Sequence, residues 1–538
     1  MVKREYDYGR HTGMKSRIKR IYDNITQVAD AKKACILIVI FFIVSLLPIV
    51  YVGLHNYPSG DDYWFGVYTN RAWVETGSIW EALKGSWRMV VRIYTEWQGT
   101  WFTLFLFTLS PNIFIEHGYY LTVFIGLGLL TGSLGYLLHF YLVRKLQFRK
   151  EVFIIILCLI LYPSIQYIPR TTSGIFWFNG IMHYSVPLLL ACVAVVNTQK
   201  FVEGGGVKNY LALFISFILL GGGSYLMPIA ASLVVLLILL RQIKVRKTEG
   251  RNKLNISFAK RNWLIFLALF MECVGLLISF LAPGNSVRGG EEFGADINWA
   301  IKTVWYAIDR GIYLGIDYFE NNMILVLIYT ILSVIVWGEM WKVSKNIRFR
   351  YPLLFVIYTN GIYWATYTPE IYARSDVSGG VHNTYFHVFL LVTLANMIYV
   401  HGWLQNKIYD YWDKKAIQET MTNSIWYGCR FKKIIEIPLL IFLFVVLFVA
   451  GNTTDLVTTN DYCVDYVVSG RMDEYVRIRE EQHRILLEED SEDVVIPEAG
   501  DQYPLLHMPL SENVEAKPNV NMAAFYGKNS VSAVHAEE

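Results

Sequence analysis

The stretch CILIVIFFIVSLLPIVYVGL, from Cys35 to Leu54, contains no charged residue. A helix of this length rises about 30 Å, which is the thickness of the hydrocarbon core of a bilayer. It follows a basic leader and lacks a cleavage site of small residues, so it predicts a retained first membrane span and not a signal peptide.

The composition of the whole chain extends this interpretation. Of the 538 residues, 54% are hydrophobic and only 17% are charged, more apolar material than one soluble core can bury. We therefore predict an all-α polytopic membrane protein with about eleven transmembrane helices. The predicted spans are 35–54, 118–142, 151–168, 184–202, 209–222, 225–240, 262–282, 321–341, 352–368, 384–402 and 434–452.

The basic residues predict the orientation in the cell membrane. Lys and Arg gather in the leader and in the segments 144–150, 241–261, 342–350 and 401–433. Because cytoplasmic loops are enriched in these residues, we expect a cytoplasmic N-terminus and an extracytoplasmic C-terminus. Two further expectations follow from keeping the basic loops inside: the stretch 99–115 does not cross, and 209–240 crosses twice.

The predicted organisation has three parts. Residues 1–34 form the cytoplasmic leader, residues 35–452 the transmembrane domain with a first outer loop at 55–117, and residues 453–538 an extracytoplasmic region. The last part is acidic, with about 18 Asp and Glu against about 6 Lys and Arg. A helix is expected over 470–490, and the region is expected to form a small cap on the outer face.

Two adjacent carboxylates, Asp61 and Asp62, follow the first span in the sequence LHNYPSGDDYWFG. Side chains of neighbouring residues diverge, so one carboxylate can face a cavity while the other anchors the loop. The alternative is an Asx-type turn in which Asp62 caps the next helix. The position beside the membrane, among aromatics such as Trp64, favours a pocket for a polar ligand.

The segment from Ser78 to Trp101 has an amphipathic pattern with several tryptophans, Trp97 among them, on one face. Ser78 and Glu81 predict a capping box at its start. Such a helix is expected in the outer interface, where indoles lie at the level of the headgroups. It either guides a lipid-linked substrate or is a packed structural helix.

A second outer loop, YIPRTTSGIFWFNGIMHYSVP, brings Arg170, Asn179 and His183 to a membrane boundary. These side chains suit hydrogen bonding to hydroxyls or phosphate, although His183 alone also fits a structural role at the interface. The fourth outer loop adds further polar residues of this kind: Glu370, Arg374, Asp376 and His382.

A third outer loop, LAPGNSVRGG, contains Asn285 and Arg288. We expect a turn whose backbone amides, together with the guanidinium, face an anion, because Arg binds phosphate in a bidentate manner. A simple polar turn is the alternative. Glu272, within the preceding span, is expected to face the interior of the bundle, since a carboxylate in lipid is costly.

Several function classes lack their sequence signatures. The chain has no P-loop, dinucleotide fingerprint, zinc-ligand spacing or nucleic-acid module, and its six cysteines build no disulfide framework. An ATP-driven pump and a nucleic-acid partner are therefore not expected.

The motifs SGDDYWFG, WQGTW, FWFNGIMHYSVP, APGNSVR and KPNVNMAAFYGKNSV resemble, in this order, a bacterial multipass family of unknown function. That family is itself similar to phage-type glucosyltransferases and to membrane glycosyltransferases of the GT-C class. The resemblance implies a GT-C-like bundle in which Asp61 or Asp62 serves sugar transfer from a polyprenyl-phosphate carrier. It implies a phosphate role for Arg288 or Arg170. We also expect Trp64, Trp97 and Gln98 among the residues that bind the substrate or its phosphate. The chain departs from the related glucosyltransferases at Gly99, Thr100 and Trp101, where glycine followed by arginine is expected.

The predicted function is transfer of a sugar from this carrier to a cell-envelope glycan or lipid-linked acceptor at the outer face of the membrane. The carboxylate would act as a general base or hold a divalent cation, while Arg288 offsets charge on the leaving phosphate. The alternatives are a transporter or flippase of a lipid-linked glycan or polymer, and a non-catalytic envelope assembly protein.

Overall fold

The computed structural model describes residues 31–248, 256–289, 296–374, 379–416, 457–488, 491–500, 502–506 and 508–534. Most of the basic leader, Asp376 and the predicted last span, 434–452, lie outside the described residues.

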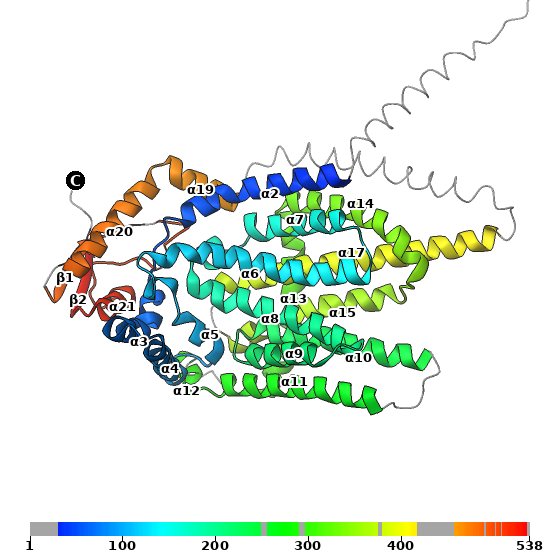
Figure 1. Ribbon diagram of the computed structural model, residues 1–538, viewed down its shortest axis with the longest axis horizontal. Helices are drawn as coiled ribbons and strands as arrows, with labels where there is room; N and C mark the ends of the chain where they lie inside the picture. The colour runs from blue at the N-terminus through cyan, green and yellow to red at the C-terminus, as the bar shows by residue number, and fades with distance from the viewer. Residues whose placement is uncertain are drawn as a thin grey trace, which may run out of the picture.

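Long apolar helices form the body of the protein and run roughly along its longest axis (Figure 1). Their bounds are α2 (Ala31–Gly53), α6 (Leu121–Leu138), α7 (Lys150–Gln166), α8 (Phe178–Val202), α9 (Val207–Gly221), α10 (Leu226–Thr248), α11 (Ile256–Phe280), α14 (Met323–Asn346), α15 (Pro352–Ala365) and α17 (Gly379–Ala416). Every predicted span that falls on described residues coincides with one of them.

Within the described residues, six helices are long and apolar enough to cross a membrane: Ala31–Gly53, Gly118–Lys145, Phe178–Val202, Ala259–Phe280, Met323–Asn346 and Gly379–Tyr411. The prediction of an α-helical membrane protein is confirmed. The figure of eleven crossings stays a prediction, because the remaining apolar helices are shorter.

The helix bounds are compatible with the two local expectations about crossing, and the crossings themselves stay predictions. The stretch 99–115 contains only α5 (Trp101–Phe107) and the 3-10 turn η1 (Pro111–Ile113), and α5 rises only about 10 Å, too little to span. The stretch 209–240 is broken between α9 and α10. Gln242 Nε2 donates to the Val202 carbonyl at 3.3 Å, so α10 returns to the end from which α9 starts.

Helix α13 (Ile297–Glu320) was not predicted. Its N-cap residue, Asp296, donates its backbone N–H to the hydroxyl of Tyr372, which lies in the segment that connects α15 to α17. The C-terminal end of α13 leads directly into α14. The Arg348–Asp410 ion pair, 2.6 Å, joins the ends of α14 and α17, so these two helices also begin at one common end of the bundle. Both ends of α13 therefore lie at that end of the bundle.

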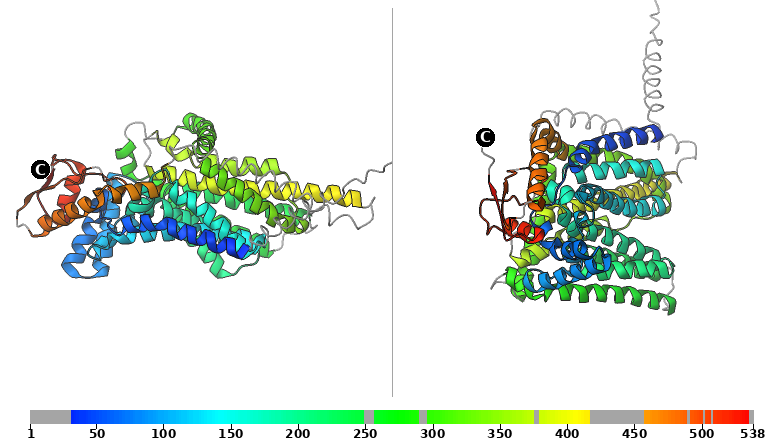
Figure 2. Two further views of the ribbon diagram at one scale, coloured as in Figure 1. Left: turned by 90° about the horizontal axis from the view of Figure 1, so that it is seen from above. Right: turned by 60° about the vertical axis from the view of Figure 1, so that its left-hand side comes forward.

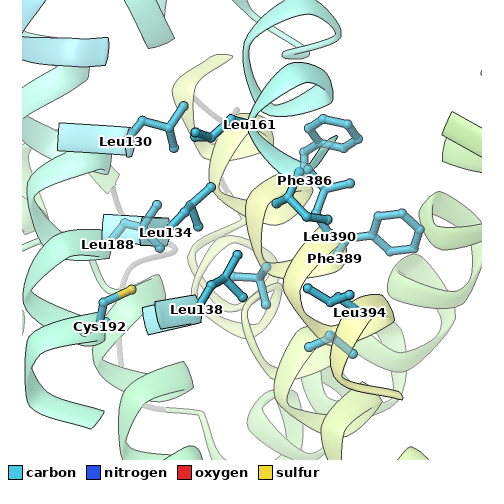
Figure 3. Close-up of a cluster of buried hydrophobic side chains, with 14 of the residues drawn as sticks. Leu130, Leu134, Leu138, Leu161, Leu188, Cys192, Phe386, Phe389, Leu390 and Leu394 are labelled. Atoms are coloured by element: carbon cyan, nitrogen blue, oxygen red, sulfur yellow. The ribbon is translucent and has the colours of Figure 1, made fainter. Parts of the chain in front are cut away.

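The centre of the bundle is a continuous apolar core. Figure 3 shows side chains of α6, α7, α8 and α17 packed against one another, with Leu134, Leu161 and Leu390 among the most deeply buried. Close packing of this kind holds helices together in lipid, where burial from water is no longer the driving force.

The described residues 457–534 form a small folded unit, called here the cap. It contains α19 (Thr459–Val468), α20 (Arg471–Glu488), β1 (Asp493–Pro497), α21 (Lys517–Tyr526) and β2 (Ser530–Val534), and the two strands pair in parallel. The helix expected over 470–490 is α20. Figure 2 shows the cap beside α3 (Asp61–Thr76) and α4 (Ile79–Glu96) at one end of the bundle, called here the capped end.

Candidate functional site

The first turn of α3 carries both acidic residues. Gly60 precedes the helix with a φ of 53°, a left-handed conformation that glycine adopts without strain, and Asp61 and Asp62 follow directly. Carboxylates are stabilised at this position because the positive end of the helix dipole lies there. The start of α3 thus determines the different directions in which the two side chains point.

Asp62 is the anchoring member of the pair. Its Oδ2 accepts hydrogen bonds from the Tyr119 hydroxyl at 2.6 Å and from the Ser59 backbone N–H at 3.0 Å, and the residue is 1% exposed. Tyr119 in turn accepts from the Phe178 N–H at 3.0 Å, which ties α3 to the start of α8. Burial raises the pKa of Asp62 to about 7, against the opposing effect of the two hydrogen bonds.

Asp61 has a different environment. Its Oδ1 is buried and has no hydrogen-bond partner among the described residues. Burial raises the pKa of the Asp61 carboxyl, while the positive charges of Lys517 and Arg288 lower it. The Asp61 carboxylate therefore has a buried oxygen without a partner and lies within the electrostatic range of two cations, an unsatisfied position that a ligand hydroxyl can fill.

Arg288 and Lys517 are both held against the tryptophan that ends α4. The Lys517 Nζ lies 4.1 Å from the centroid of the Trp97 ring and the Arg288 Cζ lies 5.2 Å from it. Arg288 also donates to Gln98 Oε1 at 2.7 Å, and Lys517 lies 5.2 Å from the centroid of the Trp64 ring. Five residues of the predicted site, namely Asp61, Trp64, Trp97, Gln98 and Arg288, therefore lie together.

Two glycines allow the segments of this site to approach. A Cβ on Gly284 would lie 2.4 Å from the Trp97 nitrogen, and one on Gly99 would lie 1.9 Å from the Ser279 carbonyl oxygen. Both distances are too short for any other residue without movement of the backbone. Close packing against Ser279 therefore explains the glycine at position 99 of the WQGTW motif, independently of any contact with a sugar donor.

The third outer loop does not have the expected conformation. Residues Pro283–Gly289 form a short helix, α12, and not an anion-binding turn, so the prediction of a backbone nest is wrong. Asn285 is used internally: its Oδ1 accepts from the Gly99 N–H at 3.1 Å and its Nδ2 donates to the Ser279 carbonyl at 2.7 Å. It holds α12 against the segment after α4, and this leaves Arg288 as the group available to a phosphate.

His183 is a neighbour of the site in the interior. It lies in the first turns of α8, and its Nδ1 pairs with the Thr103 hydroxyl at 2.9 Å, next to the ring of Phe107. Asn179, one turn earlier, is 1% exposed, and both polar atoms of its side chain lack partners among the described residues.

Arg170 belongs to a different group. Its backbone N–H donates to Asn383 Oδ1 at 2.9 Å, its carbonyl accepts from the same amide, and its side chain lies against Gly379 at the start of α17. It is thus grouped with the fourth loop, and the contacts of the described residues give Arg288, not Arg170, the place beside Asp61.

Lys517 is the site residue that the sequence interpretation missed. It lies at the first position of α21, far from the other members in the sequence, although it begins the quoted run KPNVNMAAFYGKNSV. Helix α21 packs along α3, with Phe525 and Tyr526 against Tyr63 at ring-centroid distances of 5.2 and 5.9 Å. In the sequence, only the adjacent aromatic residues Phe525 and Tyr526 could have indicated that this run docks on the first loop.

Helix α4 exposes its tryptophans. Ser78 caps it by accepting from the Glu81 N–H at 3.5 Å, but the predicted capping box is only half formed, because the Ser78 N–H donates to Thr76 Oγ1 at 3.1 Å and the Glu81 carboxylate accepts from Lys84. The small residues of the helix face α3, where Ser86 pairs with Thr69 at 2.9 Å. Trp80 and Trp87 are 64% and 57% exposed, so the packed face and the indole face are distinct.

The site combines one hydrogen-bond acceptor, the Asp61 carboxylate, with two positively charged donors, Arg288 and Lys517, at the edge of an apolar bundle. That arrangement suits deprotonation of a hydroxyl beside a phosphate, and the two cations already beside Asp61 oppose binding of a divalent cation there. The chain matches no protein-family model and no curated protein sequence.

Proposed function

We propose that the protein is a membrane glycosyltransferase of the GT-C type, which transfers a sugar from a polyprenyl-phosphate carrier to a cell-envelope glycan or lipid-linked acceptor. The observation that carries the proposal is the position of Asp61, a carboxylate with an unpartnered buried oxygen beside Arg288 and Lys517. The proposal places this reaction at the outer face of the cell membrane, with the N-terminus in the cytoplasm and the C-terminus outside.

The proposed reaction needs one base and one group that stabilises negative charge. Asp61 removes the proton of the acceptor hydroxyl as that oxygen attacks the anomeric carbon, and the bond from this carbon to the phosphate oxygen breaks. The electron pair leaves with the prenyl phosphate, whose charge Arg288 and Lys517 offset. The raised pKa of Asp61 makes its carboxylate a stronger base than a solvated one.

The aromatic surroundings support a lipid-linked donor. Trp80 and Trp87 on α4 are exposed at the capped end, where indoles favour the headgroup region of a bilayer. Residues of α13 are exposed in the same way, Trp305 at 72%. A prenyl chain can remain in lipid along these helices while its phosphate reaches the two cations.

A flippase of a lipid-linked glycan is the second candidate, and Glu272 in α11 favours it. This carboxylate is buried at 1% exposure, pairs with the Ser232 hydroxyl, and has one oxygen without a partner among the described residues. An ionisable group at this depth marks an ion or substrate path in many transporters. The two functions predict different essential residues, Asp61 for transfer and Glu272 for transport.

The test in cells is an analysis of surface glycans with and without the gene, followed by complementation. Transfer predicts that a sugar substituent is missing from an otherwise exported glycan, and that Asp61→Asn fails to restore it while Glu272→Gln succeeds. Loss of the whole exported glycan, restored by Asp61→Asn but not by Glu272→Gln, would replace the transferase by the flippase.

A further inference from the structure

Two histidines and a glutamate meet where the cap touches the first long loop. Glu116 and His117 lie between η1 and η2 (Gly118–Tyr120), and His483 comes from α20. One possible metal-ligand atom from each of the three residues lies within 4.8 Å of the other two. The segments are far apart in the sequence, so no sequence spacing indicated this group.

The distances are close to those of a bound metal. His117 Nε2 lies 3.8 Å from Glu116 Oε1, and the rings of His117 and His483 have centroids 5.3 Å apart at an angle of 58°. Two ligands of a tetrahedral zinc ion, each at about 2.0–2.1 Å, are separated by about 3.4 Å. Because Glu116 and His117 are exposed, rotation of their side chains can close this difference without movement of the backbone.

The ligand types select the class of metal. Two imidazoles and one carboxylate form a common zinc set that leaves a fourth position open. Calcium and magnesium prefer oxygen ligands alone, so they are not expected to bind tightly here.

The backbone of the loop is unusual at one of the three residues. His117 has a φ of 55°, a left-handed conformation that is uncommon outside glycine and is often found at functional positions.

The three residues line a cavity of about 520 Å³ between α3, the loop and the cap. The other charged groups lining it are Glu75, Arg71 and Arg479. Arg479 is buried and donates to the Pro58 carbonyl at 2.8 Å and to the Tyr63 hydroxyl at 2.6 Å, so its charge is partly engaged by oxygen atoms. The open fourth position of a metal would therefore face space that can hold water.

We propose that Glu116, His117 and His483 bind one zinc ion that ties α20 of the cap to the loop preceding Tyr119. Tyr119, two residues after His117, donates to Asp62, so the ion holds the cap and the anchor of the acidic pair in one arrangement. The proposal stands on this geometry and does not depend on the glycosyltransferase proposal.

The test uses the full chain, purified in detergent through an affinity tag without histidines, stripped with a chelator and dialysed against zinc chloride. We expect about one zinc per chain by elemental analysis, and a rise of the melting temperature with zinc but not with magnesium. His483→Gln and Glu116→Gln should each abolish both effects. His117→Asn should do the same, and asparagine tolerates the left-handed backbone at that position.

His55→Gln is the matched control, since His55 lies at the capped end of α2 outside the group, and it should bind zinc like the unaltered protein. The proposal is overturned if the unaltered protein retains well below about one zinc per chain, or if Glu116→Gln and His117→Asn both retain zinc and its thermal shift. Glu116 is exposed, so its variant stays informative even where His483→Gln fails to fold.

Discussion

The two adjacent carboxylates differ in what surrounds them, and this difference gives each a separate role. Each has one buried oxygen without a partner, but Asp62 Oδ2 is held by the Tyr119 hydroxyl and the Ser59 amide, while Asp61 is under the influence of the positive charges of Lys517 and Arg288. The sequence indicated that one acid would anchor and the other would face a cavity. The sequence could not show which of the two residues would be the anchor, because the answer depends on where α3 begins. The backbone conformation of Gly60 sets that starting point.

Lys517→Met tests the electrostatics at Asp61. Of the two charges that lower the pKa of this carboxyl, Lys517 has the larger effect, so its removal should raise that pKa further. A base is active above its pKa; the acid limb of kcat/KM should therefore move to higher pH. Transfer assays across pH measure this, with Lys84→Met on the exposed face of α4 as control. An unchanged acid limb would separate Lys517 from Asp61.

Asp62→Asn tests the anchor through stability. The pKa of Asp62 is about 7 in the folded protein, above the ordinary value near 4 of an unfolded chain, so the folded state holds the extra proton between these values. This contribution to stability is present at low pH and is lost as pH rises through 7, by at most about 1.4 kcal/mol per pH unit. Melting temperatures from pH 4.5 to 8 should show a shallower fall for Asp62→Asn than for the unaltered protein. Parallel curves would mean that Asp62 does not titrate as proposed.

At the scale of elements, the site depends on how closely α4 packs on α3. The small residues of α4 form the contact, and a Cβ added to Gly85 would lie 2.4 Å from the Tyr68 carbonyl oxygen. The amphipathic pattern and the Ser78 cap of α4 were predictable from sequence. The identity of the packed face was not, because the tryptophans that dominate the pattern are the exposed ones.

Gly85→Ala should separate the two helices. The backbone must shift to relieve the close contact, and we expect a loss of about 1–3 kcal/mol in the free energy of unfolding, together with reduced activity from the displaced Trp97. Gly128→Ala is the control, because its Cβ meets no atom within 4 Å in α6 and alanine favours a helix. Thermal unfolding in detergent measures both. Equal melting temperatures for the two variants would show that α4 does not need the close approach.

Helix α13 shows why some elements escaped the sequence interpretation. Its apolar residues are interrupted by Lys302, Asp309 and Arg310, so it lacks the continuous hydrophobicity of a span. It packs on the bundle through small residues, such as Gly311 against Trp364, and leaves Ile301 and Trp305 exposed. Only tertiary contacts show that its two ends lie at the same end of the bundle.

At the scale of the whole molecule, the pattern of long apolar runs predicted the helices of the bundle because lipid requires each span to satisfy its own backbone. The site could not be completed in this way. Lys517 and His483 reach the first loop only through docking of the cap on α3, and no periodicity encodes a contact between such distant segments.

The orientation of the bundle is open to direct measurement. The basic loops predict that phosphatase fused after Glu538 is active outside the cell, and that a fluorescent protein fused after residue 416 folds in the cytoplasm. Active phosphatase after residue 416 would place the capped end, and with it Asp61, on the cytoplasmic side, and the outer-face reaction would have to be withdrawn.

The central claim is that Asp61 is the base of a sugar transfer from a polyprenyl-phosphate donor. The direct measurement is release of polyprenyl phosphate from a radiolabelled donor by the purified protein in lipid nanodiscs with an envelope-glycan acceptor. Asp61→Asn should lower the rate by about 10²–10⁴-fold at an unchanged melting temperature. Glu75→Gln, an exposed acid on the same helix, should leave the rate unaltered. A full rate from Asp61→Asn, under conditions in which the unaltered protein turns over its donor, would contradict the account.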